Sequence, residues 1–173
     1  MTTAGWDGIF EEGEHILWQG RPDGQIAVRA GNIMGLVFGL FFAGFALFWM
    51  IMAFAAGGFF WMFGLLHFTI GVGISVGAVY GSAYKRRHTW YTLTNRNAYI
   101  AVDLPLAGKR LMTYAITPGS VLDLDDGNPA SVMFATRTRR TKNGTRDVRV
   151  GFERIADGRT VYGLLRKIRK EAG

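Results

Sequence analysis

Three short stretches of the sequence contain residue types that could bind a ligand or support catalysis. "DLDDGN" at 123–128 offers the carboxylates of a calcium loop, but its glycine stands at loop position 5 instead of 6, and position 12 is Phe134 instead of glutamate. "FATRTRR" at 134–140 is close to a Ser-Thr-Arg-Thr phosphate-binding signature, but Ala135 replaces the serine. "GVGISVG" at 71–77 spaces its glycines wrongly for a dinucleotide. None of these stretches predicts a catalytic or cofactor site.

Other reactive residue types are equally sparse. The sequence has no cysteine, which removes disulfides, thiolate nucleophiles and cysteine-ligated metals. The part after residue 85 shows no serine, histidine and aspartate set and no pair of carboxylates spaced for acid–base catalysis. His67 lies in an uncharged stretch, and His88 would be roughly 31 Å away along a helix, too far to share a haem with it. We therefore expect a protein that is not an enzyme and that holds no metal or cofactor.

Cationic residues form the most prominent cluster in the sequence. The stretch "RTRRTKNGTRDVR" at 137–149 holds six arginines and lysines against one aspartate. Two interpretations remain open: a solvated sheet edge whose charges prevent edge-to-edge pairing, or a surface for anionic lipid headgroups or an acidic partner protein. Nucleic acid is disfavoured, because no aromatic side chains alternate with these cations as stacking platforms. The candidate lipid or partner surface comprises Lys85, Arg86, Arg87, Arg137, Arg139, Arg140, Lys142, Arg146 and Arg149.

The charges are distributed in blocks along the chain. Between Arg29 and Lys85 there is no Asp, Glu, Lys or Arg; the segment before this block has two arginines against five acids, a net charge of −3, and the segment from Lys85 onward has 18 basic and 8 acidic residues, a net charge of +10. The uncharged block contains two apolar runs, 32–54 and 59–81, of 23 residues each. As a helix, each would be roughly 34 Å long, enough to cross a hydrocarbon core of about 30 Å. The block therefore predicts a transmembrane helical hairpin.

The flanking charges predict how this hairpin is oriented. The short loop between the runs has no charge, whereas Arg21 and Arg29 precede the first run and residues 85–87 follow the second. Cytoplasmic flanks are enriched in Lys and Arg, so both termini should be cytoplasmic. We expect a multi-pass protein of the inner (plasma) membrane. Its parts would be a cytoplasmic segment at 1–31, the hairpin at 32–81 and a cytoplasmic domain at 85–173.

Small residues recur at every fourth position in both apolar runs. The glycines concerned are Gly35 and Gly39 in the first run, and Gly73, Gly77 and Gly81 in the second. Such stripes let helix backbones approach closely in lipid, so we expect helix packing here, either within the hairpin or against another membrane protein. His67 is the only ionisable side chain inside the runs, and we expect it to make an interhelical hydrogen bond.

The chain after residue 87 has the period of β-strands and then that of a helix. Strands are expected at 88–94, 97–103, 109–116, 120–125, 131–139 and 147–155, with Asn143-Gly144 as a strong hairpin turn signal. From Asp157, a plausible N-cap, Val161, Leu164, Leu165 and Ile168 follow the i, i+3, i+4, i+7 spacing of an amphipathic helix. This pattern predicts a small antiparallel α+β domain, so the fold class is a membrane α+β protein.

Two motifs carry a resemblance to a known family. "GEHILWQGRPDG" at 13–24 precedes the first apolar run, and "YTLTNR" at 91–96 follows the second. With the membrane hairpin and the final helix, they make the chain resemble bacterial membrane proteins with a pleckstrin-homology-like (PH-like) domain. The resemblance implies a bent antiparallel sheet closed at one end by the C-terminal helix, and a non-catalytic protein.

These features favour two functions. The first is a non-catalytic inner-membrane protein whose basic cytoplasmic PH-like domain binds anionic lipid headgroups or a protein partner. The second is a small accessory or assembly subunit of a larger respiratory or photosynthetic membrane complex, docking through its glycine-striped hairpin. The expected partners are therefore membrane lipids, together with a membrane protein or further copies of the chain.

Overall fold

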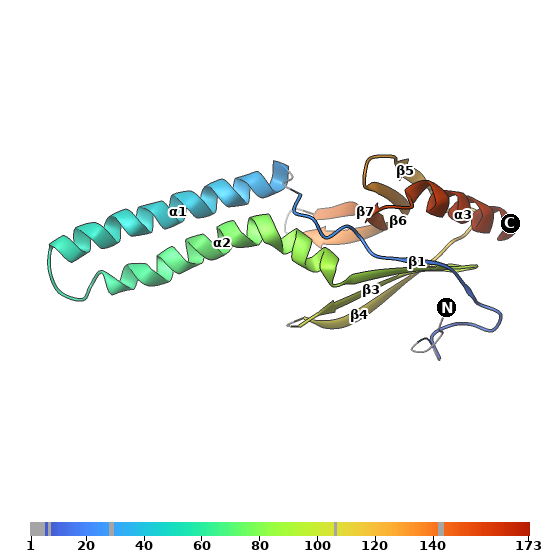
Figure 1. The fold of residues 1–173 in the computed structure, drawn as a ribbon, viewed down its shortest axis with the longest axis horizontal. Helices are drawn as coiled ribbons and strands as arrows, with labels where there is room; N and C mark the ends of the chain where they lie inside the picture. Colours follow the sequence, from blue (N-terminus) through green and yellow to red (C-terminus); the bar gives the residue numbers. More distant parts are fainter. Residues whose placement is uncertain (1–5, 7, 28–29, 106, 142–143) are drawn as a thin grey trace. The chain divides into compact units, whose positions relative to one another are not determined.

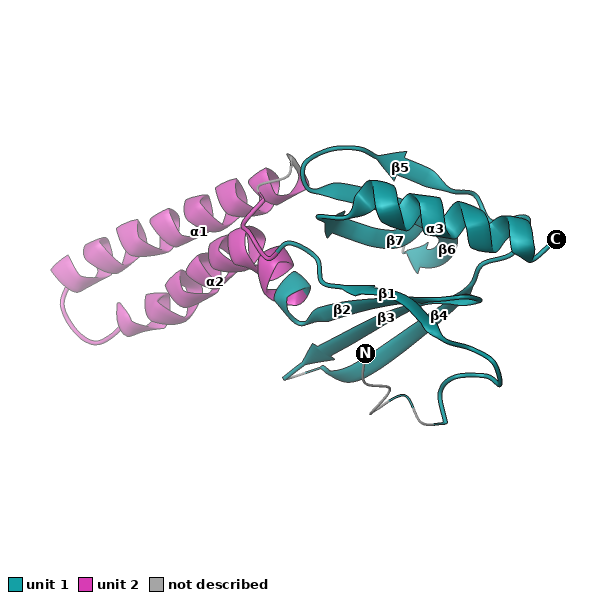
Figure 2. Cartoon of the chain, turned by 45° about the vertical axis from the view of Figure 1, so that its right-hand side comes forward, with its two compact units in different colours: residues 1–23, 86–173 teal, residues 24–85 magenta. Residues whose placement is uncertain are grey.

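The computed structural model of the protein describes residues 6, 8–27, 30–105, 107–141 and 144–173. The chain divides into two compact units (Figure 2). Residues 24–85 form the helical hairpin, and residues 1–23 together with 86–173 form what we call the β domain. The β domain is thus assembled from segments on both sides of the helical hairpin.

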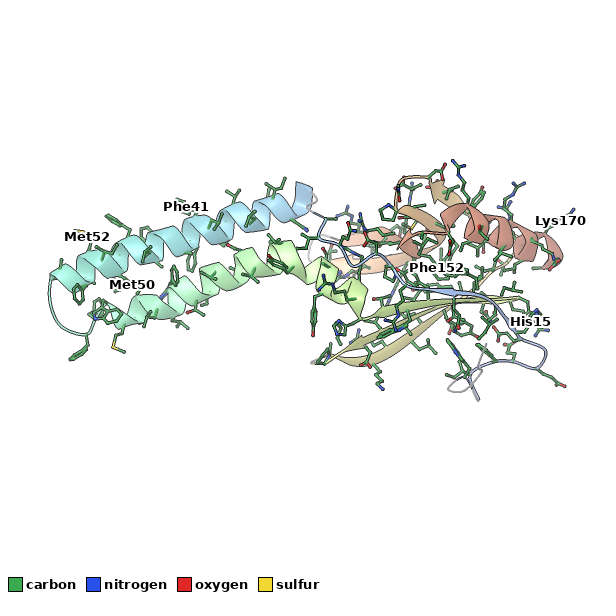
Figure 3. All side chains as sticks on the ribbon, in the orientation of Figure 1. His15, Phe41, Met50, Met52, Phe152 and Lys170 are labelled. Atoms are coloured by element: carbon green, nitrogen blue, oxygen red, sulfur yellow. The ribbon has the colours of Figure 1, made fainter. Side chains whose placement is uncertain are left out.

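The helical hairpin consists of α1 (Ala30–Ala55) and α2 (Met62–Arg87), each with 26 residues. Both helices are long and apolar enough to cross a membrane. Most of their large apolar side chains are exposed, and Figure 3 shows Phe41 and Met52 on the outer side of α1. Buried core helices of soluble proteins cover such side chains, so this exposure weakly indicates membrane association.

Helix α2 extends further than the apolar run predicts. The run ends at Gly81, whereas the helix continues through the basic residues to Arg87. Hydropathy marks where apolar residues stop, but Lys and Arg are themselves good helix formers and do not end a helix. Only His88 separates α2 from the first strand that follows it.

The first sheet of the β domain is antiparallel, with strand order β1-β2-β3-β4 (Figure 1). Its strands are β1 (Ile16–Gly20), β2 (Thr89–Thr94), β3 (Asn97–Leu104) and β4 (Gly108–Ala115). The last three match the predicted strands closely, because alternating apolar residues end at turn residues there. Gly108 has a φ of 76°, a conformation that side chains with a Cβ rarely adopt.

Strand β1 lies in the N-terminal segment, where no strand was expected. It pairs with β2 through Trp18 opposite Leu93 and Gly20 opposite Tyr91. With only five residues and an irregular register between Ile16 and Trp18, β1 lacks the length of alternation that makes a strand recognisable. Its pairing brings the N-terminal segment into the β domain.

The second sheet has the order β5-β6-β7 and is followed by the C-terminal helix (Figure 1). Its elements are β5 (Asp123–Asp125), β6 (Ala130–Thr141), β7 (Gly144–Ile155) and α3 (Gly158–Glu171). The predicted antiparallel α+β domain is confirmed, although its strands form two sheets instead of the single bent sheet that the resemblance implies. Asp157 precedes α3, but its side chain makes no capping hydrogen bond.

The hydrophobic core joins the two sheets and α3. Its fully buried side chains include Leu93 from β2, Phe134 from β6, Phe152 from β7 and Leu165 from α3. Phe152 lies inside the β domain in Figure 3, and its ring centroid is 4.8 Å from that of Tyr91 and 4.9 Å from that of Phe134. Full burial of such a side chain is worth about 1.5–3 kcal/mol, so this cluster holds the sheets together.

Candidate functional site

The basic stretch forms a two-stranded extension of the second sheet. We call Thr136–Thr141 of β6 and Gly144–Arg149 of β7 the basic β-hairpin. Strand β5 pairs only with Ser131, Val132 and Met133, so it does not reach this extension. All the described side chains of the basic β-hairpin are exposed, whereas the preceding part of β6 is buried. The extension therefore has two solvent-exposed faces.

Strand register determines which cations share a face. Arg139 lies directly opposite Arg146, and Arg137 lies opposite Val148. Because side chains alternate along a strand, these four residues are on one face, which we call the three-arginine face. Lys142 was also predicted to belong to the surface, but it lies outside the described residues.

The opposite face of the basic β-hairpin carries balanced charges. The Arg149 guanidinium is 2.6 Å from the Asp123 carboxylate, and Thr138 Oγ1 donates a hydrogen bond to Asp147 Oδ1 at 2.7 Å. Arg140 is exposed on this same face. The predicted cations are therefore divided between two surfaces with different electrostatic character.

The three-arginine face has no such compensation. Within the described part of the chain, Arg137, Arg139 and Arg146 have no ion-pair partner. The face continues the core-facing side of the sheet, since Ala135 and Val150, one pair closer to the core, pack against the core. Cations thus replace apolar side chains where the core ends.

The three residues at the end of α2 occupy different environments. Lys85 and Arg87 are exposed, but Arg86 is only 8% exposed and donates a hydrogen bond from Nε to the carbonyl oxygen of Asp23 at 2.8 Å. Arg86 was predicted to belong to the lipid or partner surface together with Lys85 and Arg87. Its side chain is buried and holds the backbone of Asp23, because consecutive residues of a helix point in different directions.

Asp23 connects Arg86 to strand β7. Its N–H donates to the carbonyl oxygen of Arg154 at 2.7 Å, and its carboxylate is 2.6 Å from the Arg154 guanidinium. Both side chains of this ion pair are mostly buried, with 20% of Arg154 and 23% of Asp23 exposed. Arg154 also has a φ of 54°, which is unusual for a residue other than glycine.

A second polar network fastens the N-terminal segment to the turn between β2 and β3. The Glu14 carboxylate accepts hydrogen bonds from Thr94 Oγ1, Asn97 Nδ2 and the Tyr99 hydroxyl, and from the backbone N–H of Glu11. Burial alone would raise the pKa of Glu14, but these hydrogen bonds outweigh it and hold the pKa below its usual value. The sequence analysis missed this network, although Glu14 and Thr94 lie in the two motifs that carried the family resemblance.

Further contacts join the same two motifs. Asn95 Oδ1 accepts a hydrogen bond from the His15 N–H, and Asn95 Nδ2 donates to the Gly13 carbonyl oxygen. Arg96 and Glu11 form an exposed ion pair at 3.2 Å. The motif residues thus have structural roles at this turn.

The glycines of the helical hairpin have two kinds of surroundings. A Cβ atom at Gly39 would lie 2.4 Å from Ser75 Oγ and 2.7 Å from the Gly71 carbonyl oxygen, and one at Gly35 would lie 3.3 Å from the Ala78 Cβ. Gly35 and Gly39 therefore face α2 at close approach. In contrast, Cβ atoms at Gly73, Gly77 and Gly81 would meet no atom within 4 Å. That stripe faces away from α1, and Gly71 contacts α1 at Ala43 instead.

His67 contacts its own helix. Its Nδ1 is 3.2 Å from the Phe63 carbonyl oxygen, one turn earlier in α2, and its ring is near those of Phe63 and Phe42. The interhelical hydrogen bond expected for His67 is therefore replaced by an intrahelical one. The histidine meets α1 through the aromatic ring of Phe42.

Two further features of the β domain have their charged groups paired internally. An open groove of about 660 Å³ is lined by the N-terminal segment, the turn between β2 and β3, and α3, but its charged residues are paired, Arg96 with Glu11 and Lys167 with Glu171. Near the start of α3, the Arg159 guanidinium hydrogen-bonds Asp126 and lowers the pKa of that carboxyl. The described residues contain no cluster of three or more histidine and carboxylate side chains that could hold a metal ion.

Comparison of the chain with known protein families, with curated proteins and with solved structures finds no match. The three-arginine face, defined by the register of β6 and β7, is the candidate site.

Proposed function

We propose that this protein is a non-catalytic protein of the bacterial inner membrane, anchored by the helical hairpin, and that its β domain binds anionic lipid headgroups or an acidic partner at the membrane surface. The observation that carries the proposal is the combination of two exposed apolar helices with an uncompensated cationic face on a domain that follows α2 after a single residue. Such a connection keeps the domain at the bilayer and so raises the effective concentration of headgroups around it.

The pairing of β1 with β2 supports the two-span arrangement. These strands precede and follow the helical hairpin, and yet they are hydrogen-bonded neighbours in one sheet. If the hairpin crosses a membrane, both flanks must then lie on the same side. The Lys and Arg residues beside the helices favour the cytoplasm as that side.

A PH-like identity for the β domain is part of the proposal. It is supported by antiparallel strands followed by a C-terminal helix, although these strands form two sheets where the resemblance implies one bent sheet. The two motifs behind the resemblance meet at Glu14 and Asn95, as expected if they preserve a shared fold and not a catalytic site.

Purification of the full chain from membranes in mild detergent tests the proposal. We expect the protein to resist extraction by alkaline carbonate and to elute as one species without larger subunits. Release by carbonate would contradict membrane anchoring, whatever the β domain binds.

A second candidate function is an accessory or assembly subunit of a larger membrane complex. It is favoured by the stripe of Gly73, Gly77 and Gly81, where close approach to α1 is not used and another helix could pack. Co-elution with stoichiometric larger subunits would support this candidate over the first.

A further inference from the structure

We propose that the three-arginine face, and not the other surfaces of the β domain, binds the phosphate groups of anionic membrane lipids. This inference rests on the proposed membrane anchoring and specifies its ligand and its residues. The face consists of Arg137, Arg139 and Arg146 with Val148, as defined by the register of β6 and β7.

The arrangement of charges on this face points to an anionic ligand. Arg139 and Arg146 are directly opposite each other, and like charges in that position destabilise a strand pair unless an anion lies between them. On the opposite face of the hairpin, in contrast, the Arg149 guanidinium is neutralised by Asp123 of β5. Of the two faces of the hairpin, the one with the three arginines is thus the face on which the described residues include no carboxylate.

Guanidinium groups suit phosphate in particular. Their planar donors can form two parallel hydrogen bonds with phosphate oxygens, and lysine cannot match that geometry. All three cations on this face are arginines. Arg137 is two residues from Arg139 along the strand, so the face offers a row of phosphate positions along its length and not a single closed pocket.

The surface around the arginines fits a lipid layer better than a protein. A stable protein interface buries about 800 Å² on each partner and has an apolar centre. Among the described residues of the basic β-hairpin, the only large apolar side chain is Val148, which is 43% exposed beside the cations. Two narrow strands with one apolar residue between arginines can meet headgroups without needing a large complementary surface. Anionic phospholipid is therefore the occupant that we assign.

The absence of cysteine from the sequence permits a clean test on the full chain. A single Thr145→Cys substitution would carry a fluorophore at the exposed end of the basic β-hairpin, on the face opposite the three arginines. The labelled protein would be reconstituted in nanodiscs of phosphatidylcholine alone, or with part of it replaced by phosphatidylglycerol. Quenching by a lipid with a nitroxide headgroup then reports how often the hairpin is at the bilayer.

Two triple variants with equal loss of charge separate the faces. The test variant carries R137Q, R139Q and R146Q, and the matched control carries R110Q, R140Q and R166Q, which remove exposed cations elsewhere in the β domain. We expect quenching to increase with phosphatidylglycerol and to decrease at high salt. The anionic-lipid-dependent part should fall about tenfold or more in the test variant and remain in the control.

The possible results are distinguishable. A chain that fails to co-elute with the nanodiscs contradicts the proposed anchoring, and the inference with it. Co-elution with equal quenching in neutral and anionic discs overturns the inference alone. An equal loss in both triple variants also overturns it, because attraction would then depend on total charge and not on this face. If an acidic protein co-eluted with the wild-type chain and not with the test variant, that protein would replace the lipid as the ligand of this face. Unchanged thermal unfolding of both variants checks that folding is intact.

Discussion

Glu14 illustrates how one carboxylate can organise a terminal segment. It accepts hydrogen bonds from the side chains of Thr94 at the end of β2 and of Asn97 and Tyr99 in β3. Hydrogen bonds to a charged acceptor are stronger than neutral ones, and removing the acceptor leaves several donors without a partner. This side chain is therefore one of the groups that attach the segment before β1 to the sheet, beside the hydrogen bonds of Asn95 and the ring contacts of Tyr99.

Replacing Glu14 with alanine should destabilise the β domain by about 1–2 kcal/mol. The loss should concentrate in β1 and the turn after β2, because those parts meet at the carboxylate. Hydrogen exchange of the full chain in detergent would show it as faster exchange in residues 14–20 and 94–97. Glu12→Ala, at an exposed neighbouring carboxylate, should leave exchange unchanged; equal effects of both substitutions would contradict the role of Glu14.

The same network predicts a pH dependence at both extremes. The folded state lowers the pKa of Glu14, so its contribution to stability is present above the ordinary value of 4.5 and is lost as pH falls through the lowered pKa. Burial, and then the hydrogen bond to Glu14, raises the pKa of Tyr99 from 10.0 to about 12, so that contribution is present below pH 10.0 and is lost as pH rises through about 12. In Glu14→Gln, the unfolding midpoint should fall less steeply than in the wild type as the pH is lowered below 4.5. A wild-type slope in that variant would show that other groups are responsible.

The ion pair between Asp23 and Arg154 should be the most sensitive to mutation. Because it is mostly buried, Asp23→Ala leaves a guanidinium without its partner, at a cost of about 3 kcal/mol. Asp126→Ala breaks the exposed pair with Arg159 and should have little effect, since exposed pairs contribute little. Chemical unfolding of the two variants, followed by tryptophan fluorescence, compares them directly. Similar losses would mean that burial does not determine the effect.

The two helices of the hairpin use small residues on different faces, and this difference can be tested. Gly39→Leu would force a side chain into Ser75 and Gly71, which should weaken the contact between the helices by about 1–2 kcal/mol. Gly77→Leu adds the same side chain where nothing lies within 4 Å, and should leave the hairpin intact. Loss of helical circular dichroism on titration with sodium dodecyl sulfate measures both. If Gly77→Leu alone reduced co-purification of a larger membrane protein, the accessory-subunit function would gain support.

The sequence predicted those elements that are determined by residues within one segment, and missed those that depend on contacts with a distant segment. Strands β2, β3 and β4 and helix α3 were predicted because alternation, turn residues and helical spacing lie within each segment. Strand β1 was missed because its five residues acquire strand pairing only from β2, about seventy residues later. A spacing of four residues identifies small residues on one helix face, but which face meets α1 depends on how the helices are rotated. Gly71 rather than Gly73 therefore makes the contact.

The sequence predicts which cations make up the candidate site, but not how they are distributed between the two faces of the hairpin. Counting cations located the basic β-hairpin, and alternation alone separates Arg137 and Arg139 from Arg140. Assigning Arg146 to the same face requires the cross-strand register, and recognising that Arg149 is neutralised requires the position of Asp123. Such contacts between separate segments of the chain have no signature in either segment alone.

At the scale of the whole molecule, the β domain constrains the membrane topology independently of charge. Residues 16–20 and 91–94 are neighbouring strands of one sheet, and the two apolar helices lie between them in the sequence. A single membrane crossing would place these strands in different compartments, where they could not pair. If the helices cross a membrane, an even number of crossings is therefore required, and the charge asymmetry predicts that the termini are cytoplasmic.

Reporter fusions in a bacterial host test both parts of this argument. Green fluorescent protein should fluoresce when fused before Met1 or after Gly173, and alkaline phosphatase should be inactive at either end but active when inserted between Gly57 and Gly58, in the loop between the helices. The two ends must give the same result because β1 pairs with β2, whichever side they occupy. Active phosphatase at both ends would reverse the orientation but keep the hairpin. Opposite results at the two ends would rule out the hairpin topology, since the strand pairing could not form across the bilayer.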